Sequence, residues 1–149
     1  MSTASITFPT SATPQEIVER ALAASSSRAC TVLVSCRSVT NLRWARTTLT
    51  TNGETVTLSV TLLAFVDVDG GVGVGSLTVS APSLESLPAL VAAAERLAVQ
   101  GGPAEDAQAI AEGIAASPDW SDGPVIATSS EFATLAPAIG EIFASGRVD

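Results

Sequence analysis

Two arginines and an asparagine near one tryptophan are the first candidates for chemistry in this sequence. The stretch NLRWAR, residues 41–46, holds two of the chain's seven cations, all of which are arginine. Guanidinium groups bind carboxylates through paired hydrogen bonds, and an asparagine amide can both donate and accept. On a strand, Asn41 and Arg43 share one side, and Trp44 and Arg46 share the other. Either Trp44 lies in the core with Arg43 in water, or Asn41, Arg43 and Arg46 line a surface that meets another domain, subunit or peptide.

The chain has no histidine, which removes the most common groups of catalytic sites. Histidine-based acid–base catalysis, Ser-His-Asp triads and His-ligated zinc are therefore excluded on these residues. Two cysteines are present, Cys30 and Cys36, without a Cys-x-x-Cys spacing. On one continuous strand they would share a face but lie about 20 Å apart. That distance is too long for a disulfide, so we expect two small buried hydrophobes in a reducing compartment.

Glycines and acidic residues give weaker signals. The stretch GGVGVG, residues 70–75, leads into a strand, whereas a phosphate-binding loop leads into a helix. Gly71, Gly73 and Gly75 fall on one face of this strand, where bare backbone allows close approach. We expect a packed helix there, with a ligand as the alternative. Asp67 and Asp69 lack the spacing of a calcium loop.

A hydrolase with a carboxylate-only site is a weak third possibility. Glu112, Asp119 and Asp122 lie near one predicted loop, but their spacing does not pair them. No metal-ligating or catalytic residue is therefore predicted in this chain.

The overall charge and hydropathy pattern indicate the class of partner. The net charge of −8 disfavours nucleic acid as a partner, although Arg37, Arg43 and Arg46 come close to clustering. The N-terminal sequence has neither the basic nor the apolar region of a signal peptide. No apolar run reaches about 18 residues, so no membrane span is predicted. The sequence therefore favours a cytoplasmic protein.

Period-two and helical patterns predict the elements that would position these residues. Thr13, Pro14 and Glu16 form a helix start with a capping box. Strands are expected at residues 30–37, 40–51, 54–68 and 72–79, with a hairpin turn at Asn52-Gly53. A helix follows, beginning between Ser83 and Pro88, with an apolar stripe of Leu87, Leu90, Val91, Ala94, Leu97 and Ala98.

Two further helices are expected in the last third of the chain. One begins at Pro103, with an inner face of Ala107, Ile110, Ala111 and Ile114. The last is capped by Ser129, carries Phe132, Leu135, Ala136, Ile139, Ile142 and Phe143, and is kinked at Pro137.

The predicted fold class is α+β, with a four-stranded antiparallel β-meander covered by helices. One helix precedes the strands and three follow. The expected ranges are a flexible N-terminus at residues 1–12, the α+β domain at residues 13–116, and a loop with the C-terminal helix of the same domain at residues 117–149.

This pattern resembles the N-terminal domain of the TldD/PmbA (modulator of DNA gyrase) metallopeptidase family. The resemblance rests on an EIVERAL helix, residues 16–22, and on a loose A-x-V-x-V strand at residues 29–34. It continues with the Asn-x-Arg strand at residues 41–43, a long strand, an Asp-Gly hairpin, a glycine-containing strand and an alanine-rich helix at residues 90–98. It covers roughly residues 13–116.

The resemblance implies peptide maturation or degradation by paired subunits. One subunit of such a pair carries a zinc-binding His-Glu-x-x-x-His helix, and a C-terminal β-rich domain completes each subunit. Neither the motif nor that domain is in this sequence, and the stretch ETVTLSVTLL, residues 54–63, lacks the family's usual Gly and Arg. Zinc is thus expected only in a catalytic partner or in a missing domain. Whether Asp149 is the native C-terminus stays open.

Together these observations predict a non-catalytic domain or truncated member of a TldD/PmbA-like subunit. Its expected partners are a peptidase subunit or its own C-terminal domain, with a peptide substrate, in a homo- or heterodimer. Asn41, Arg43 and Arg46 would contact the peptide or the partner. The alternative is a stand-alone acidic adaptor or chaperone that uses its sheet face or the strand at Gly71, Gly73 and Gly75.

Overall fold

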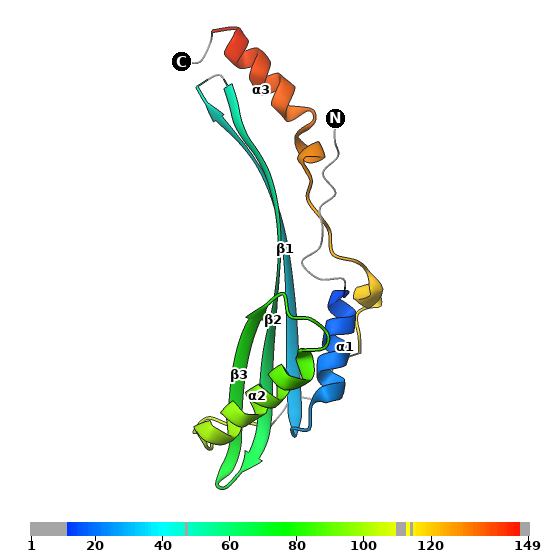
Figure 1. The fold of residues 1–149 in the computed structure, drawn as a ribbon, viewed down its shortest axis with the longest axis vertical. Helices are drawn as coiled ribbons and strands as arrows, with labels where there is room; N and C mark the ends of the chain where they lie inside the picture. The colour runs from blue at the N-terminus through cyan, green and yellow to red at the C-terminus, as the bar shows by residue number, and fades with distance from the viewer. Residues whose placement is uncertain (1–11, 47, 110–112, 114, 147–149) are drawn as a thin grey trace. The chain divides into compact units, whose positions relative to one another are not determined.

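The protein is α+β, with one three-stranded antiparallel sheet in the order β1-β2-β3. The computed structural model describes residues 12–46, 48–109, 113 and 115–146, so residues 1–11 of the predicted flexible N-terminus lie outside the described residues. The elements follow one another in Figure 1 as α1 (Pro14–Ala24), β1 (Ala29–Ala45), β2 (Thr48–Val68), β3 (Gly71–Ser80), α2 (Leu87–Gly101), the 3-10 helices η1 (Pro118–Ser121) and η2 (Ser129–Phe132), and α3 (Leu135–Ala144).

Helix α1 begins at the predicted capping box. The Glu16 amide donates to Thr13 Oγ1 at 3.2 Å, and the Thr13 amide donates to Glu16 Oε2 at 2.7 Å. Pro14 occupies the first turn, where its missing N–H costs nothing. Ile17 and Ala21 are fully buried, so this helix presents a short apolar face to the core.

The predicted hairpin at Asn52-Gly53 is wrong, and so is the four-stranded meander. Residues 29–45 form one continuous strand, and both Asn52 and Gly53 lie inside β2. The chain turns instead at Arg46, whose φ of 52° is in the left-handed region. An Asn-Gly step only permits a turn, whereas pairing along the whole length of two alternating strands decides where the turn falls.

Strand β2 has the apolar face that its alternation predicts. Every second residue from Leu58 to Ala64 is buried, and the residues between them are less so. Strand β3 pairs with it antiparallel, with Phe65 opposite Val74 and Thr61 opposite Thr78. Hydroxyl groups of Thr61 and Thr78 lie 2.9 Å apart on the face that does not enter the core.

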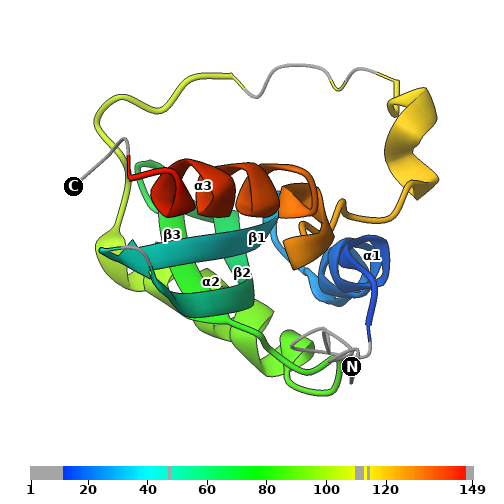
Figure 2. The ribbon, with the colours of Figure 1, turned by 90° about the horizontal axis from the view of Figure 1, so that it is seen from above.

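Helix α2 packs along β3 and also contacts α1 (Figure 2). Its buried residues are Leu87, Val91, Ala94 and Ala98, while the predicted stripe residue Leu97 is exposed. A Cβ added at Gly75 would lie 2.0 Å from the Ala94 carbonyl oxygen, and one at Gly73 would lie 2.2 Å from that of Ala98. Only glycine allows the helix to come this close to the strand.

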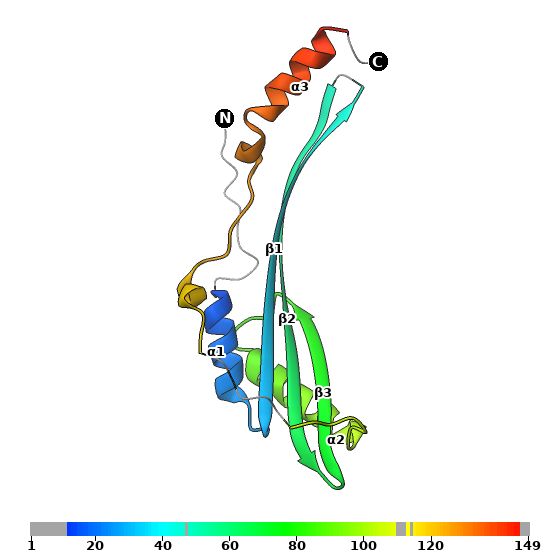
Figure 3. The same cartoon turned by 180° about the vertical axis from the view of Figure 1, so that it is seen from behind.

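The helix predicted from Pro103 is wrong for its described part. Pro103 forms an isolated bridge with Gly73, and the Ala104 amide donates to the Val72 carbonyl at 2.9 Å. Figure 3 shows the chain leaving α2 beside β3. Because the unpaired edge of β3 offers backbone groups to this segment, edge pairing replaces a helical turn. Of the predicted inner face, Ala107 is exposed, and Ile110, Ala111 and Ile114 lie outside the described residues.

The predicted C-terminal helix is divided into two elements. Ser129 belongs to η2, and α3 starts at Leu135, so Pro137 lies in the first turn of α3 and not in the middle of a longer helix. A proline inside a longer helix would clash with the carbonyl of residue 133, which favours a new start just before it. None of the ten residues of α3 is buried.

The described chain divides into two compact units, neither continuous in sequence. Of the described residues, unit 1 comprises those within 37–57 and 124–146, and unit 2 comprises those within 12–36 and 58–123. Unit 2 holds α1, α2, β3 and the buried core. Among the described residues, no helix is both long enough and apolar enough to cross a membrane.

Candidate functional site

The parts of β1 and β2 that belong to unit 1 carry an exposed face with arginines and without a carboxylate. Arg37, Asn41 and Arg43 are exposed odd-numbered residues of β1, with the half-buried Val39 between the first two, and an added Cβ at Gly53 of β2 would lie 4.0 Å from Asn41 Nδ2. Asn41 and Gly53 are therefore on the same face, with the exposed residues Thr51, Thr55 and Thr57 of β2. We call this set of residues, from Arg37 to Thr57, the Arg43 face.

The one acidic residue of the segment Arg37–Thr57 does not lie on the Arg43 face. Glu54 is an even-numbered residue of β2, so its side chain points to the opposite face. There it accepts a hydrogen bond from the amide of Ser129. Nearby, Ser38 Oγ accepts from the Ala127 amide at 2.9 Å. These contacts hold the segment before α3 against β1 and β2 and engage the Glu54 carboxylate.

Two of the three predicted contact residues lie on the Arg43 face, and the third lies in the turn at its end. Asn41 and Arg43 share the Arg43 face as expected, and the Arg43 carbonyl accepts from Thr50 Oγ1 at 3.2 Å. Arg46 does not continue the alternation with Trp44, because β1 ends at Ala45 and Arg46 lies in the turn. Trp44 is half-buried, on the side opposite Arg43. The cations thus lie on the face and at its end.

The face of β3 that carries the predicted close-approach glycines lies against a helix. The space over Gly73 and Gly75 is taken by the backbone of α2, and a Cβ on Gly71 would lie 3.4 Å from Pro103 Cβ. Gly73 and Gly75 therefore position α2 and leave no room there for a ligand, whereas Gly71 lies against Pro103.

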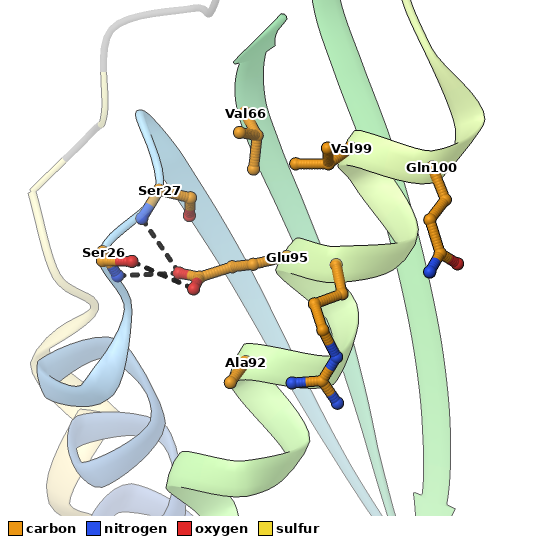
Figure 4. A pocket seen from close by; sticks show the side chains of 8 residues that line it. Ser26, Ser27, Val66, Ala92, Glu95, Val99 and Gln100 are labelled. Carbon is orange, nitrogen blue, oxygen red and sulfur yellow. Dashed lines mark hydrogen bonds between the residues drawn. The ribbon is translucent and has the colours of Figure 1, made fainter.

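The Glu95 carboxylate of α2 binds the serines that follow α1, a contact that the sequence did not suggest. We call Glu95 with Ser25, Ser26 and Ser27 the Glu95 cluster. Glu95 Oε1 accepts from the amides of Ser26 and Ser27 at 2.7 and 2.9 Å, and Oε2 accepts from Ser26 Oγ at 3.0 Å. Figure 4 shows these bonds at the edge of a cavity of about 460 Å³ lined also by Val66, Arg96, Val99 and Gln100. The sequence signal for this contact was a run of three serines and, far along the chain, one glutamate in an apolar helix.

The electrostatics of the Glu95 cluster favour a structural role. Burial alone would raise the pKa of Glu95, but the hydrogen bonds from Ser26, Ser25 and Ser27 lower it below its ordinary value. The carboxylate is thus held ionised and supplied with donors, which leaves it poorly suited to accept a proton in catalysis.

The cysteines have the properties of structural thiols. Cys30 and Cys36 are both free and half-buried. Burial raises the pKa of each thiol, which disfavours the nucleophilic thiolate.

The described residues do not fit a zinc site. No group of three or more His, Cys, Asp or Glu lies close enough together in the described part of the chain to hold a metal ion. Asp67 is paired with Arg28 at 2.9 Å. Of the acidic residues near the predicted loop, Asp119 and Asp122 lie at η1, and Glu112 is outside the described residues.

Comparison with family models, with curated proteins and with solved structures gave no match to this chain.

Proposed function

We propose that this chain is a non-catalytic domain or truncated member of a TldD/PmbA-like metallopeptidase subunit. It would act in peptide maturation or degradation by associating with a peptidase subunit and forming one wall of a peptide cleft. The observation that carries the proposal is the Arg43 face, an exposed, carboxylate-free surface on a chain of net charge −8. The cytoplasm is the proposed compartment, which agrees with two free cysteines.

The chemistry of the Arg43 face suits an extended peptide or a partner strand. Arg37 and Arg43 offer planar sets of N–H donors for carboxylates, and Asn41 can pair with a peptide group. Threonines of β2 add hydroxyl groups without adding negative charge. In this proposal catalysis and zinc belong to the partner subunit, as the family resemblance implies.

Binding of a labelled, unstructured, acidic peptide tests the proposal at this face. We expect the double substitution Arg43→Ala, Arg46→Ala to weaken binding about tenfold, since two charge-assisted contacts are lost. Arg20→Ala is the matched control, because Arg20 is an exposed cation on α1 in unit 2. Fluorescence anisotropy reads the affinity. Equal binding by the double variant and the native chain would remove the support for a peptide cleft.

A stand-alone adaptor or chaperone is the second candidate, and α3 is the observation that favours it. Leu135 and Ile142 of this helix are about half exposed, at 49% and 48%. They are seven residues apart and therefore on one side of the helix. The strand face at Gly73 and Gly75 cannot serve as its binding surface, because α2 covers it. Self-association in light scattering without any peptidase subunit, abolished by Ile142→Glu, would favour this candidate.

A further inference from the structure

A cavity of about 480 Å³ lies in unit 2, on the face of the sheet that α2 does not cover. Its floor is formed by Phe65 of β2 and Val74 of β3, which are directly opposite in the strand register. Because Gly73 and Gly75 face α2, the alternate residues Val72 and Val74 face away from it. Val74 remains 41% exposed, although a large apolar residue in a sheet would normally be covered.

The segment that follows α2 forms one wall of this cavity, and the first residues of this segment are bound to β3. The bridge between Gly73 and Pro103 and the hydrogen bond from Ala104 to Val72 hold the segment that follows α2. Beyond this point Ala104, Asp106 and Ala107 line the cavity. Binding sites for small ligands usually have a volume in this range and an apolar lining with a few polar groups.

The charges at the cavity select the kind of group that would bind. Arg28 lines the cavity, but its guanidinium pairs with Asp67 at 2.9 Å. Asp106 also lines it and makes no ion pair within the described part of the chain. One unpaired carboxylate beside an apolar floor is complementary to an ammonium group next to an apolar side chain.

We propose that this cavity binds the amino-terminal residue of a peptide, with a large apolar side chain over Phe65 and Val74 and its ammonium group at Asp106. This assignment is independent of the Arg43 face, which lies in unit 1, and of the function proposed for it. It predicts a preference for free amino termini that begin with a residue such as leucine.

Leucyl-alanyl-alanine amide is the probe that tests this assignment. We expect it to shift the amide resonances of Val72, Val74, Ala104 and Ala107 in the isotope-labelled full chain, with a Kd on the order of 1 mM. The N-acetylated peptide should bind about threefold more weakly, as expected for one exposed ion pair. The glycyl analogue should bind about tenfold more weakly, because it lacks the apolar side chain. Equal affinity for the acetylated peptide, or shifts confined to other residues, would overturn the proposal.

Two neighbouring acidic residues provide matched variants. Asp106→Asn should lower the affinity for the free peptide to that of the acetylated one and leave the acetylated peptide unaffected. Glu105→Gln should change neither affinity, because Glu105 is exposed and does not line the cavity. Both residues are in an exposed segment, so both variants should fold. A loss of the same size in both variants would show a general charge effect and would contradict a specific role for Asp106.

Discussion

The side chain of Glu95 connects α2 to the loop that follows α1. Its carboxylate accepts from three serines that end α1, although it belongs to α2. Backbone N–H groups outside helices and strands need an acceptor, and a carboxylate is a strong one. The Glu95 side chain thus accepts hydrogen bonds from loop donors that would otherwise bind water.

Replacement of Glu95 by Gln should destabilise the chain by about 1–2 kcal/mol at pH 7, the usual cost of losing hydrogen bonds to a charged acceptor. Because the pKa of Glu95 is lower in the folded chain than the ordinary 4.5, its contribution is complete above about pH 4.5. It is lost as the pH falls through the folded-state pKa. Urea unfolding from pH 7 to pH 3 measures this, and the difference between native chain and variant should shrink at the acidic end.

Glu19→Gln is the control, because Glu19 is an exposed residue of α1. A pH-independent difference between native chain and Glu95→Gln would contradict the account of the cluster.

Ala81 has a φ of 43°, which is costly for a residue with a Cβ. Its amide donates to the Leu58 carbonyl at 3.0 Å, so the conformation is held by the sheet. Ala81→Gly should therefore stabilise the chain by about 0.5 kcal/mol, the relief of strain less the entropy that glycine adds to the unfolded chain. Thermal unfolding measures it. Ala89→Gly, within α2, should have the opposite sign.

At the scale of elements, the packing of α2 on β3 depends on two glycines. Gly75→Ala would place a Cβ 2.0 Å from the Ala94 carbonyl oxygen, so the helix must move. We expect a loss of about 3 kcal/mol or more, as for other overpacked cores. Gly140→Ala in α3 meets no atom within 4 Å and should leave stability unchanged or slightly higher. Denaturant midpoints of the two variants measure these changes in stability. An unchanged midpoint for Gly75→Ala would contradict this packing of α2 on β3.

Elements set by local chemistry could be predicted from the sequence, and those set by distant pairing could not. The capping box of α1 and the apolar faces of β2 and α2 follow from neighbouring residues, and they agree with the structure except at Leu97, which is exposed. The turn at Arg46 and the bridge at Pro103 depend on which strands pair, and local signals at Asn52-Gly53 and Pro103 pointed elsewhere.

The candidate site shows the same division. Alternation alone predicted that Asn41 and Arg43 share a face. It could not reveal that Glu54 is engaged by Ser129, or that Glu95 meets the serine run, because these residues are about 70 positions apart.

At the scale of the whole molecule, a cationic face on an acidic chain should make peptide binding sensitive to salt. The Debye length falls from about 10 Å at 0.1 M salt to about 3 Å at 1 M, which screens exposed charges. The affinity of the native chain for an acidic peptide should therefore fall several-fold over this range. The Arg43→Ala, Arg46→Ala variant should depend less on salt, because Arg37 is then the one arginine left on the Arg43 face. Parallel salt dependence in both proteins would place the binding surface elsewhere.

Purification of the tagged chain from its own cell, followed by sequencing of the bound protein and a peptidase assay of the eluate, tests the proposed function most directly. We expect a bound subunit with a His-Glu-x-x-x-His helix and peptidase activity that a zinc chelator abolishes. We also expect Arg43→Ala, Arg46→Ala to reduce cleavage of an unstructured peptide and Arg20→Ala to leave it unchanged. An eluate without such a subunit and without chelator-sensitive activity would contradict the proposed function.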